Sequence, residues 1–171
     1  MTAMTVEQLA WLAGFIDGEG SIGFHEHKMS PFRPNQRTPV FVPFLQISNT
    51  HLGVLRHIAQ WFPKSRIHID ARRARQGHLP CGLFVIAGLA VYPVLEMLLP
   101  FLVIKKPQAE AVLEFRALPK FKRWRTGING PQIAREKSRI PPDELEKRLR
   151  IVTHIRALNH RGLASQRARL P

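Results

Sequence analysis

The sequence predicts an α+β fold in which helices cover one face of a four-stranded antiparallel sheet. Three observations predict it: short stretches of alternating apolar and polar residues, helical apolar patterns between them, and a length of 171 residues that are 44% hydrophobic. A chain of this size and composition can bury the core of one compact domain. The expected order is helix, two strands, helix, two strands and two helices, followed by a basic segment and a final helix.

The first helix is expected to begin at the capping-box pattern Thr5-Val6-Glu7-Gln8. It is apolar on most sides and carries a face of very small side chains, which allows another backbone to approach closely. A symmetric pair of such helices would suit a homodimer interface, with packing inside one chain as the alternative. The residues assigned to this interface are Leu9, Ala10, Leu12, Ala13, Gly14 and Asp17.

Two strands follow the first helix. Residues 21–28 alternate, with Ile22 and Phe24 on one face. Residues 40–48 form the second strand, in which Pro43 indicates an edge position or a bulge. Together they predict one antiparallel pair joined by a polar loop.

The remaining elements follow from spacing. Apolar residues at helical spacing predict a helix over 52–62, capped by Ser48, Asn49 or Thr50. Residues 66–70 and 82–86 read as strands, and 91–99 and 107–118 as helices. Leu83 to Ile104 is nearly uncharged, but its glycine and prolines favour a strand and a short helix over one membrane-spanning helix.

The C-terminal third divides into three parts after a core of residues 1–118. Residues 119–140 are basic and broken by glycine and proline, which predicts a surface arm. Residues 141–162 form a last helix that begins with acidic residues, and 163–171 form a tail expected to be disordered. The apolar stripe of that helix comprises Leu145, Leu149, Val152 and Ile155.

The charge is strongly asymmetric. The formal net charge is +14, yet the first 26 residues contain no Lys or Arg. Such an excess indicates a polyanionic partner, usually nucleic acid. A single cysteine, Cys81, excludes an intramolecular disulfide and a cysteine-based zinc site. The absence of a signal sequence predicts an intracellular protein, of a prokaryotic cytoplasm or an organelle, with no membrane partner.

The first helix ends in two carboxylates interleaved with glycines, Asp17-Gly18-Glu19-Gly20. Carboxylates at a helix C-terminus are poorly placed, because that end of the dipole is already negative. A bound divalent cation is the simplest compensation, since Mg²⁺ prefers oxygen ligands.

The segment Leu12-Ala13-Gly14-Phe15-Ile16-Asp17-Gly18-Glu19-Gly20 resembles the signature of the LAGLIDADG homing endonucleases. The segment from Pro100 to Lys106, followed by Gln108-Ala109, is similar to the family's entry into its late helix. The resemblance covers about residues 5–118 and contains one copy of the signature. It therefore implies the αββαββα homing-endonuclease fold and the single-motif, homodimeric subclass.

The resemblance implies a site-specific endonuclease of intron homing that hydrolyses both strands of a long pseudo-palindromic DNA duplex. It implies Mg²⁺ as cofactor, which Mn²⁺ or Ca²⁺ can replace in binding, and no small-molecule cofactor. Glu19 matches the metal-binding acid and the Gly18 carbonyl its partner, whereas Asp17 is either a further ligand or a structural acid. Lys105 matches the active-site lysine, with a plain phosphate contact as alternative. Asn49 matches a solvent-positioning residue, with a helix cap as alternative.

The same resemblance places the sheet in the DNA major groove, where base pairs are distinguishable. His25 and His27 could instead share a metal ion, but no third ligand is evident. A maturase-like or regulatory binder without cleavage remains the alternative function, and a ribosomal protein a third. The expected DNA contacts on strands are Ser21, Gly23, His25, His27, Gln46, Arg66, His68 and Asp70; those in loops and the arm are Arg33, Arg37, Arg72, Arg73, Arg75, Lys120, Lys122 and Arg123.

Overall fold

The computed structural model describes residues 4–27, 39–70, 79–119 and 140–167. The expected order of elements is confirmed, and an added 3-10 turn lies between the last strand and the helix after it. The elements are α1 (Val6–Glu19), β1 (Gly20–His27), β2 (Val40–Asn49), α2 (Leu52–Trp61), β3 (Arg66–Asp70), β4 (Cys81–Ala87), η2 (Gly88–Ala90), α3 (Val91–Leu98), α4 (Lys106–Ala117) and α6 (Pro142–Arg167).

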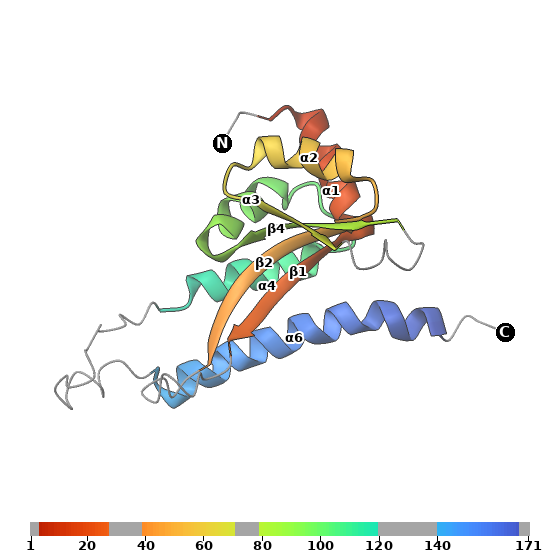
Figure 1. Ribbon diagram of the computed structural model, residues 1–171. Coiled ribbons are helices and arrows are strands. Elements are labelled where there is room, and N and C mark those ends of the chain that lie inside the picture. Colours follow the sequence, from red (N-terminus) through yellow and green to blue (C-terminus); the bar gives the residue numbers. More distant parts are fainter. Residues whose placement is uncertain (1–3, 28–38, 71–78, 120–139, 168–171) are drawn as a thin grey trace, which may run out of the picture.

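The four strands form one antiparallel sheet in the order β1-β2-β4-β3 (Figure 1). Strand β2 pairs with β1 over its length from Val40 to Ile47, but with β4 only from Phe44 onward. Pro43 therefore lies where β2 has a neighbour on one side alone. This is the edge-like position that its missing N–H predicts.

The core lies between the helices and one face of the sheet. Ile22, Leu45 and Phe84 point into it from three different strands and are at most 1% exposed. Leu12 and Ile16 of α1 belong to the same cluster, together with residues of α2, α3 and α4. The continuous apolar run around Leu83 to Ile104 is thus β4, η2, α3 and the following turn. Among the described residues, no helix is long and apolar enough to cross a bilayer.

Helix α6 lies along α4 and the free edge of β1 (Figure 1). The Asn159 side-chain amide donates a hydrogen bond to the backbone carbonyl of Ile22 at 3.1 Å. The Arg156 guanidinium pairs with Glu26 of β1 at 2.8 Å. A helix at this position satisfies edge groups that would otherwise be open to pairing with another strand.

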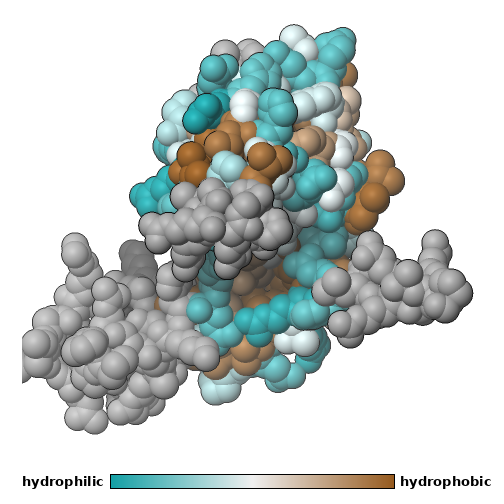
Figure 2. All heavy atoms as spheres, turned by 45° about the vertical axis from the view of Figure 1, so that its right-hand side comes forward, coloured by the Kyte–Doolittle hydropathy of each residue, from teal (hydrophilic) through white to brown (hydrophobic). Residues whose placement is uncertain are grey.

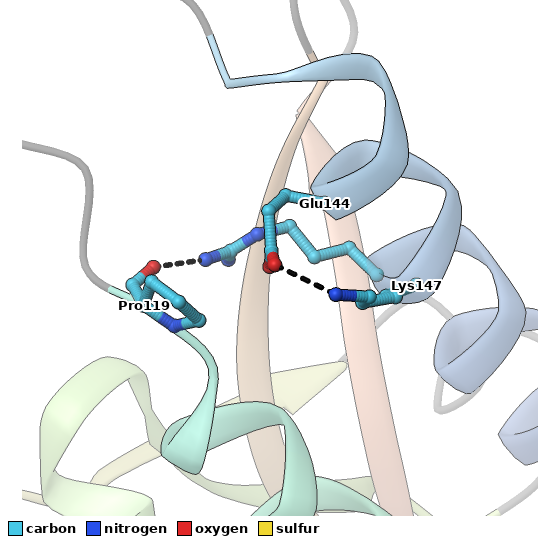
Figure 3. A network of polar contacts seen from close by, with 4 residues as sticks. Pro119, Glu144 and Lys147 are labelled. Atoms are coloured by element: carbon cyan, nitrogen blue, oxygen red, sulfur yellow. Dashed lines mark hydrogen bonds and ion pairs between the residues drawn. The ribbon is translucent and has the colours of Figure 1, made fainter.

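The start of α6 is fixed to the end of α4. The Arg148 guanidinium donates to the Pro119 carbonyl at 2.6 Å and lies over the Phe115 ring at 5.0 Å. Lys147 pairs with Glu144 one turn earlier at 2.9 Å (Figure 3). These contacts bracket the segment 120–139, which contains most of the predicted basic arm and lies outside the described residues.

The structure corrects three expectations about helices. The N-cap of α2 is His51, whose Nδ1 accepts from the Val54 N–H at 3.2 Å, rather than Ser48, Asn49 or Thr50. Helix α6 continues past residue 162 to Arg167. Leu149 is 41% exposed, whereas Ile151, Val152 and Ile155 are the buried residues of this helix. Arg148, next to Leu149, is the residue that lies over Phe115 of α4.

Candidate functional site

Glu19 is the last residue of α1 and its side chain is exposed. The chain turns directly from helix to strand at Gly20, whose N–H bonds to the Ile16 carbonyl. A Cβ atom at Gly20 would lie 2.6 Å from that carbonyl oxygen, so only glycine permits this turn. The immediate turn fixes Glu19 at the junction between the helix and the sheet.

Asp17 connects α1 to a segment that is remote in sequence. Its Oδ2 accepts from the Val103 N–H and its Oδ1 from the Lys105 N–H, both at 2.8 Å. Each carboxylate oxygen is thus occupied by a backbone amide. These two bonds fit the structural role expected as one alternative for Asp17.

Lys105 is held at the same end of the sheet by this contact. It caps α4, and its carbonyl accepts the Ala109 N–H at 3.0 Å. Because Asp17 precedes Glu19 by two residues, the bond from the Lys105 amide brings that lysine beside the end of α1. The Lys105 backbone therefore lies near the end of α1 that carries Glu19.

Asn49, the third expected catalytic residue, lies at the end of β2. The register pairs Ile47 with Gly20, so the end of β2 lies next to the junction between α1 and β1. The Asn49 Oδ1 accepts the His51 N–H at 2.7 Å, which anchors the turn into α2. This contact uses the Asn49 side-chain oxygen, so both a turn-stabilising role and a solvent-positioning role fit this geometry.

One chain supplies few metal ligands at this end of the sheet. The described residues contain no group of three or more His, Cys, Asp or Glu side chains that could hold a metal. Glu19 offers a carboxylate, and Gly18 offers one of the carbonyls that the last turn of a helix leaves without an intrahelical partner. Both are the hard oxygen donors that Mg²⁺ prefers. They fit a divalent cation that receives its other ligands from water, substrate or a second chain.

The face of the sheet opposite the core carries the expected DNA contacts of the strands. Ser21, Gln46, Val85 and Arg66 form one row across all four strands, because each pairs with the next. His68 and Asp70 continue the same face along β3. Arg66 and His68 are exposed, whereas Asp70 is half-buried. The outer positions of β3 are therefore those predicted from alternation.

Gly23 is a correction on this face. It is buried, and a Cβ there would lie 3.2 Å from the Phe44 ring, so its backbone lies under that ring and cannot reach a base. The His25 ring stacks on Phe44 with centroids 4.1 Å apart. Phe44 was not expected on this face, and neither were Val42, Leu83, Val85 and Ala87. The signal for them was that the sequences of β2 and β4 are apolar at nearly every position.

The loop and arm contacts expected from charge cannot be placed. They lie outside the described residues, and they are Arg33, Arg37, Arg72, Arg73, Arg75, Lys120, Lys122 and Arg123. His27 ends β1. The visible surface in Figure 2 is mainly hydrophilic with separate hydrophobic groups.

The exposed face of α1 differs from the one expected. Leu12 and Ala13 are at most 1% exposed, and Leu9 packs against the core, so these three belong to the interior of the single chain. The open face consists of Ala10, Trp11, Gly14 and Gly18. Trp11 is 44% exposed and stacks on Phe15, with Trp61 of α2 against its edge.

Comparison with known proteins gives structural but no sequence relatives. No protein-family profile and no curated protein matches the sequence. Among solved structures, the homing endonuclease I-CvuI in complex with the I-CreI target has a TM-score of 0.64 at 19% identity, covering 89% of this chain and 82% of its own. The group I intron-encoded homing endonuclease I-CeuI with DNA gives 0.52 at 20% identity, covering 69% and 57%. The meganuclease I-SmaMI bound to uncleavable DNA gives 0.59 at 13% identity, covering 87% and 45%.

These similarities establish the class of fold. The chain is an α+β protein whose four-stranded antiparallel sheet and helices match those of homing endonucleases. It has the fold of the LAGLIDADG type, with the signature-like segment on α1 where the helix meets the sheet.

Proposed function

We propose that this chain is a site-specific DNA endonuclease that acts as a homodimer and hydrolyses both strands of a pseudo-palindromic duplex. The observation that carries the proposal is the hydrogen bond from the Lys105 amide to Asp17, two residues before Glu19. It supports the proposal because it holds the Lys105 backbone beside the end of α1, where Glu19 lies. The net charge of +14 supports a polyanionic substrate.

The acid and the lysine have separate roles in this proposal. Glu19 and the Gly18 carbonyl would hold a divalent ion, Mg²⁺ with Mn²⁺ or Ca²⁺ as substitutes in binding. Such an ion, when bound, lowers the pKa of a water molecule and neutralises charge on a scissile phosphate. Lys105 would contact the phosphate or orient the attacking water through its ammonium group. Asn49 would orient solvent at the same end of β2.

Homodimer formation explains two glycines that the single chain does not. Gly14 and Gly18 lie within α1, where each costs about 0.5–1 kcal/mol relative to alanine. A Cβ at either position would meet nothing within 4 Å, so packing in one chain does not require glycine there. Paired α1 helices from two chains would use the open space and bring both Glu19 side chains to one site.

The sheet would provide sequence specificity. Exposed Arg66 and half-buried Gln46 share a row on the outer face and suit guanine and adenine, respectively, in the major groove. Ser21, His25, His68 and Asp70 would add contacts on the same face. The arginines and lysines of the loops and the arm would hold phosphates, which is the default partner of such residues.

A cleavage selection tests the proposed function. The purified full chain would be mixed with a random duplex library in Mg²⁺, in Ca²⁺ and in EDTA, and cut and bound sequences would be recovered separately. The proposal predicts recurrent double-strand cuts at one pseudo-palindromic sequence in Mg²⁺ only. Recovery of one bound but uncut sequence under all conditions would instead support a non-cleaving, maturase-like or regulatory binder.

A further inference from the structure

The outer face of the sheet carries an apolar band, defined here as Val42, Phe44, Leu83, Val85 and Ala87. Pairing of Phe44 with Ala87 joins the β2 and β4 parts of the band. Val85 lies in the same row as Gln46 and Arg66. The opposite face of these two strands already forms the core, so β2 and β4 are apolar on both sides.

This composition is unusual for a face that helices do not cover. An antiparallel sheet with one free face normally alternates apolar and polar residues. Here Val42, Leu83 and Val85 are half-buried and Ala87 is exposed. The band therefore needs a partner with apolar groups at matching positions.

The surroundings of the band indicate which partner. Arg66 and His68 lie beside it on β3, His25 lies beside it on β1, and the described outer positions of the four strands include one acid, Asp70. The chain as a whole carries a net charge of +14. A polyanion fits this frame better than an apolar protein surface. The apolar group that double-stranded DNA presents in its major groove is the C5-methyl of thymine.

We propose, on the basis of the proposed function, that the apolar band recognises thymine methyl groups and sets a requirement for T·A pairs in each half-site. Valine, leucine and alanine cannot satisfy the donors and acceptors of a G·C edge. An A·T edge presents polar groups as well, so the preference for T·A comes from the C5-methyl, the apolar group that thymine adds to the groove. Gln46 and Arg66, in the same row, would read the flanking purines.

The spacing of the band matches the duplex. Successive outward residues on one strand are about 6.6 Å apart, and base pairs are about 3.4 Å apart, so neighbours in the band lie about two base pairs apart. Phe44 supports the band from within: it is 8% exposed, lies over Gly23 and stacks on His25. Val42, Leu83, Val85 and Ala87 are then the contacting residues, and Phe44 is a positioning residue.

The test uses the full chain and the duplex recovered from selection. Each thymine would be replaced in turn by deoxyuridine, which removes only the methyl group, and binding would be measured in Ca²⁺. We expect a loss of about fourfold per contacted methyl, the value for one buried methylene-sized group. Replacing a sensitive T·A pair by C·G should also weaken binding, and 5-methylcytosine at that pair should restore part of it.

Variants connect the effect to the band. Val85→Thr keeps the shape and β-branching of the side chain but removes an apolar group, and it should abolish the deoxyuridine effect at one position in each half-site. Val54→Thr is the matched control, because Val54 packs on the helical side of the sheet. It should leave every deoxyuridine effect unchanged.

The failure of this proposal differs from the failure of the proposed function. A specific site that binds equally well with thymine or deoxyuridine throughout would overturn thymine recognition while leaving the endonuclease intact. A deoxyuridine effect that survives Val85→Thr, Val42→Thr and Leu83→Asn alike would also overturn it. If no specific duplex is recovered under any condition, both proposals are wrong.

Discussion

The Asp17 carboxylate and the Lys105 backbone amide are joined by a hydrogen bond of 2.8 Å across 88 residues of sequence. The other oxygen of Asp17 holds Val103 at the same distance. Because Asp17 bonds to both Val103 and Lys105, it fixes the orientation of this segment as well as its distance from α1. The end of α1 and the start of α4 are therefore held together by one side chain.

The first prediction concerns this contact. Asp17→Asn should displace Lys105, because the amide replaces one acceptor by a donor that faces an N–H. We expect the free energy of unfolding to fall by about 0.5–1.5 kcal/mol, the net contribution of one hydrogen bond, because Asp17 is only half-buried. Cleavage should fall more than DNA binding. Chemical denaturation and single-turnover cleavage would measure the two effects.

Metal dependence distinguishes positioning from ligation at Asp17. If Asp17 positions Lys105, the Mg²⁺ concentration for half-maximal cleavage should be unchanged in Asp17→Asn. Glu19→Asp, which retains a carboxylate but shortens it, should shift that concentration and serves as the matched control. A large shift of the half-maximal Mg²⁺ concentration in Asp17→Asn would indicate that Asp17 is a metal ligand.

The second prediction concerns the open face of α1. Gly14→Leu should abolish dimer formation, because the side chain would fill the space that a second helix requires. Sedimentation would detect the change in mass. Glu110→Leu places the same side chain on an exposed position of α4 and should leave the mass unchanged. An unaltered dimer in Gly14→Leu would refute pairing through α1.

The third prediction concerns alkaline pH. Burial raises the pKa of Tyr92 above its ordinary value of 10.0, and the guanidinium groups of Arg116 and Arg148 partly oppose this shift. Because the folded pKa is the higher one, the stability linked to this group is complete below pH 10.0. It is lost as the pH rises through the folded pKa.

Tyr92 can be followed without a label, because it is the only tyrosine in the chain. Tyrosinate absorbance should rise at a higher pH in the folded protein than in denaturant. As the pH rises from about 9 to the folded pKa of Tyr92, the free energy of unfolding should fall less in Tyr92→Phe than in the wild type. The range starts near pH 9 because the reference pKa of tyrosine is about 10. Identical titration in the folded and denatured protein would contradict the expected shift.

The fourth prediction concerns salt. If loop and arm residues contact phosphates, log K for DNA binding should fall linearly with log salt, with a slope of about −0.9 per contact. Fluorescence anisotropy with the selected duplex would measure the slope, and circular dichroism would show that the fold is unchanged. An affinity that stays constant up to about 0.3 M salt would exclude extensive phosphate contact.

Local sequence patterns predicted most of the fold. The bounds Arg66–Asp70 of β3 and the capping box at Thr5 were correct because both depend on neighbours in sequence. The sequence did not predict which side of α1 faces the core, since this helix is apolar on most sides. The structure assigns Leu12 and Ala13 to the interior and leaves Ala10 and Gly14 open.

Long-range contacts were beyond local patterns. The hydrogen bond from Asn159 to the Ile22 carbonyl spans 137 residues and depends on how α6 lies along β1. The apolar band was also missed, because β2 and β4 do not alternate and their outer residues look like core. The candidate acid and lysine could be named from the resemblance, but their connection through Asp17 required the structure.

The most direct test of the central claim is strand cleavage by mixed dimers at the selected site. Wild-type chains should linearise a supercoiled plasmid that carries the site, and Glu19→Gln chains should bind it without cutting. Wild-type and Glu19→Gln chains that carry different tags would be co-expressed and purified as a heterodimer. This heterodimer should nick only one strand, because only one of its two Glu19 carboxylates is lost. Wild-type rates of double-strand cleavage by the Glu19→Gln homodimer would contradict the assignment of Glu19 and the mechanism built on it.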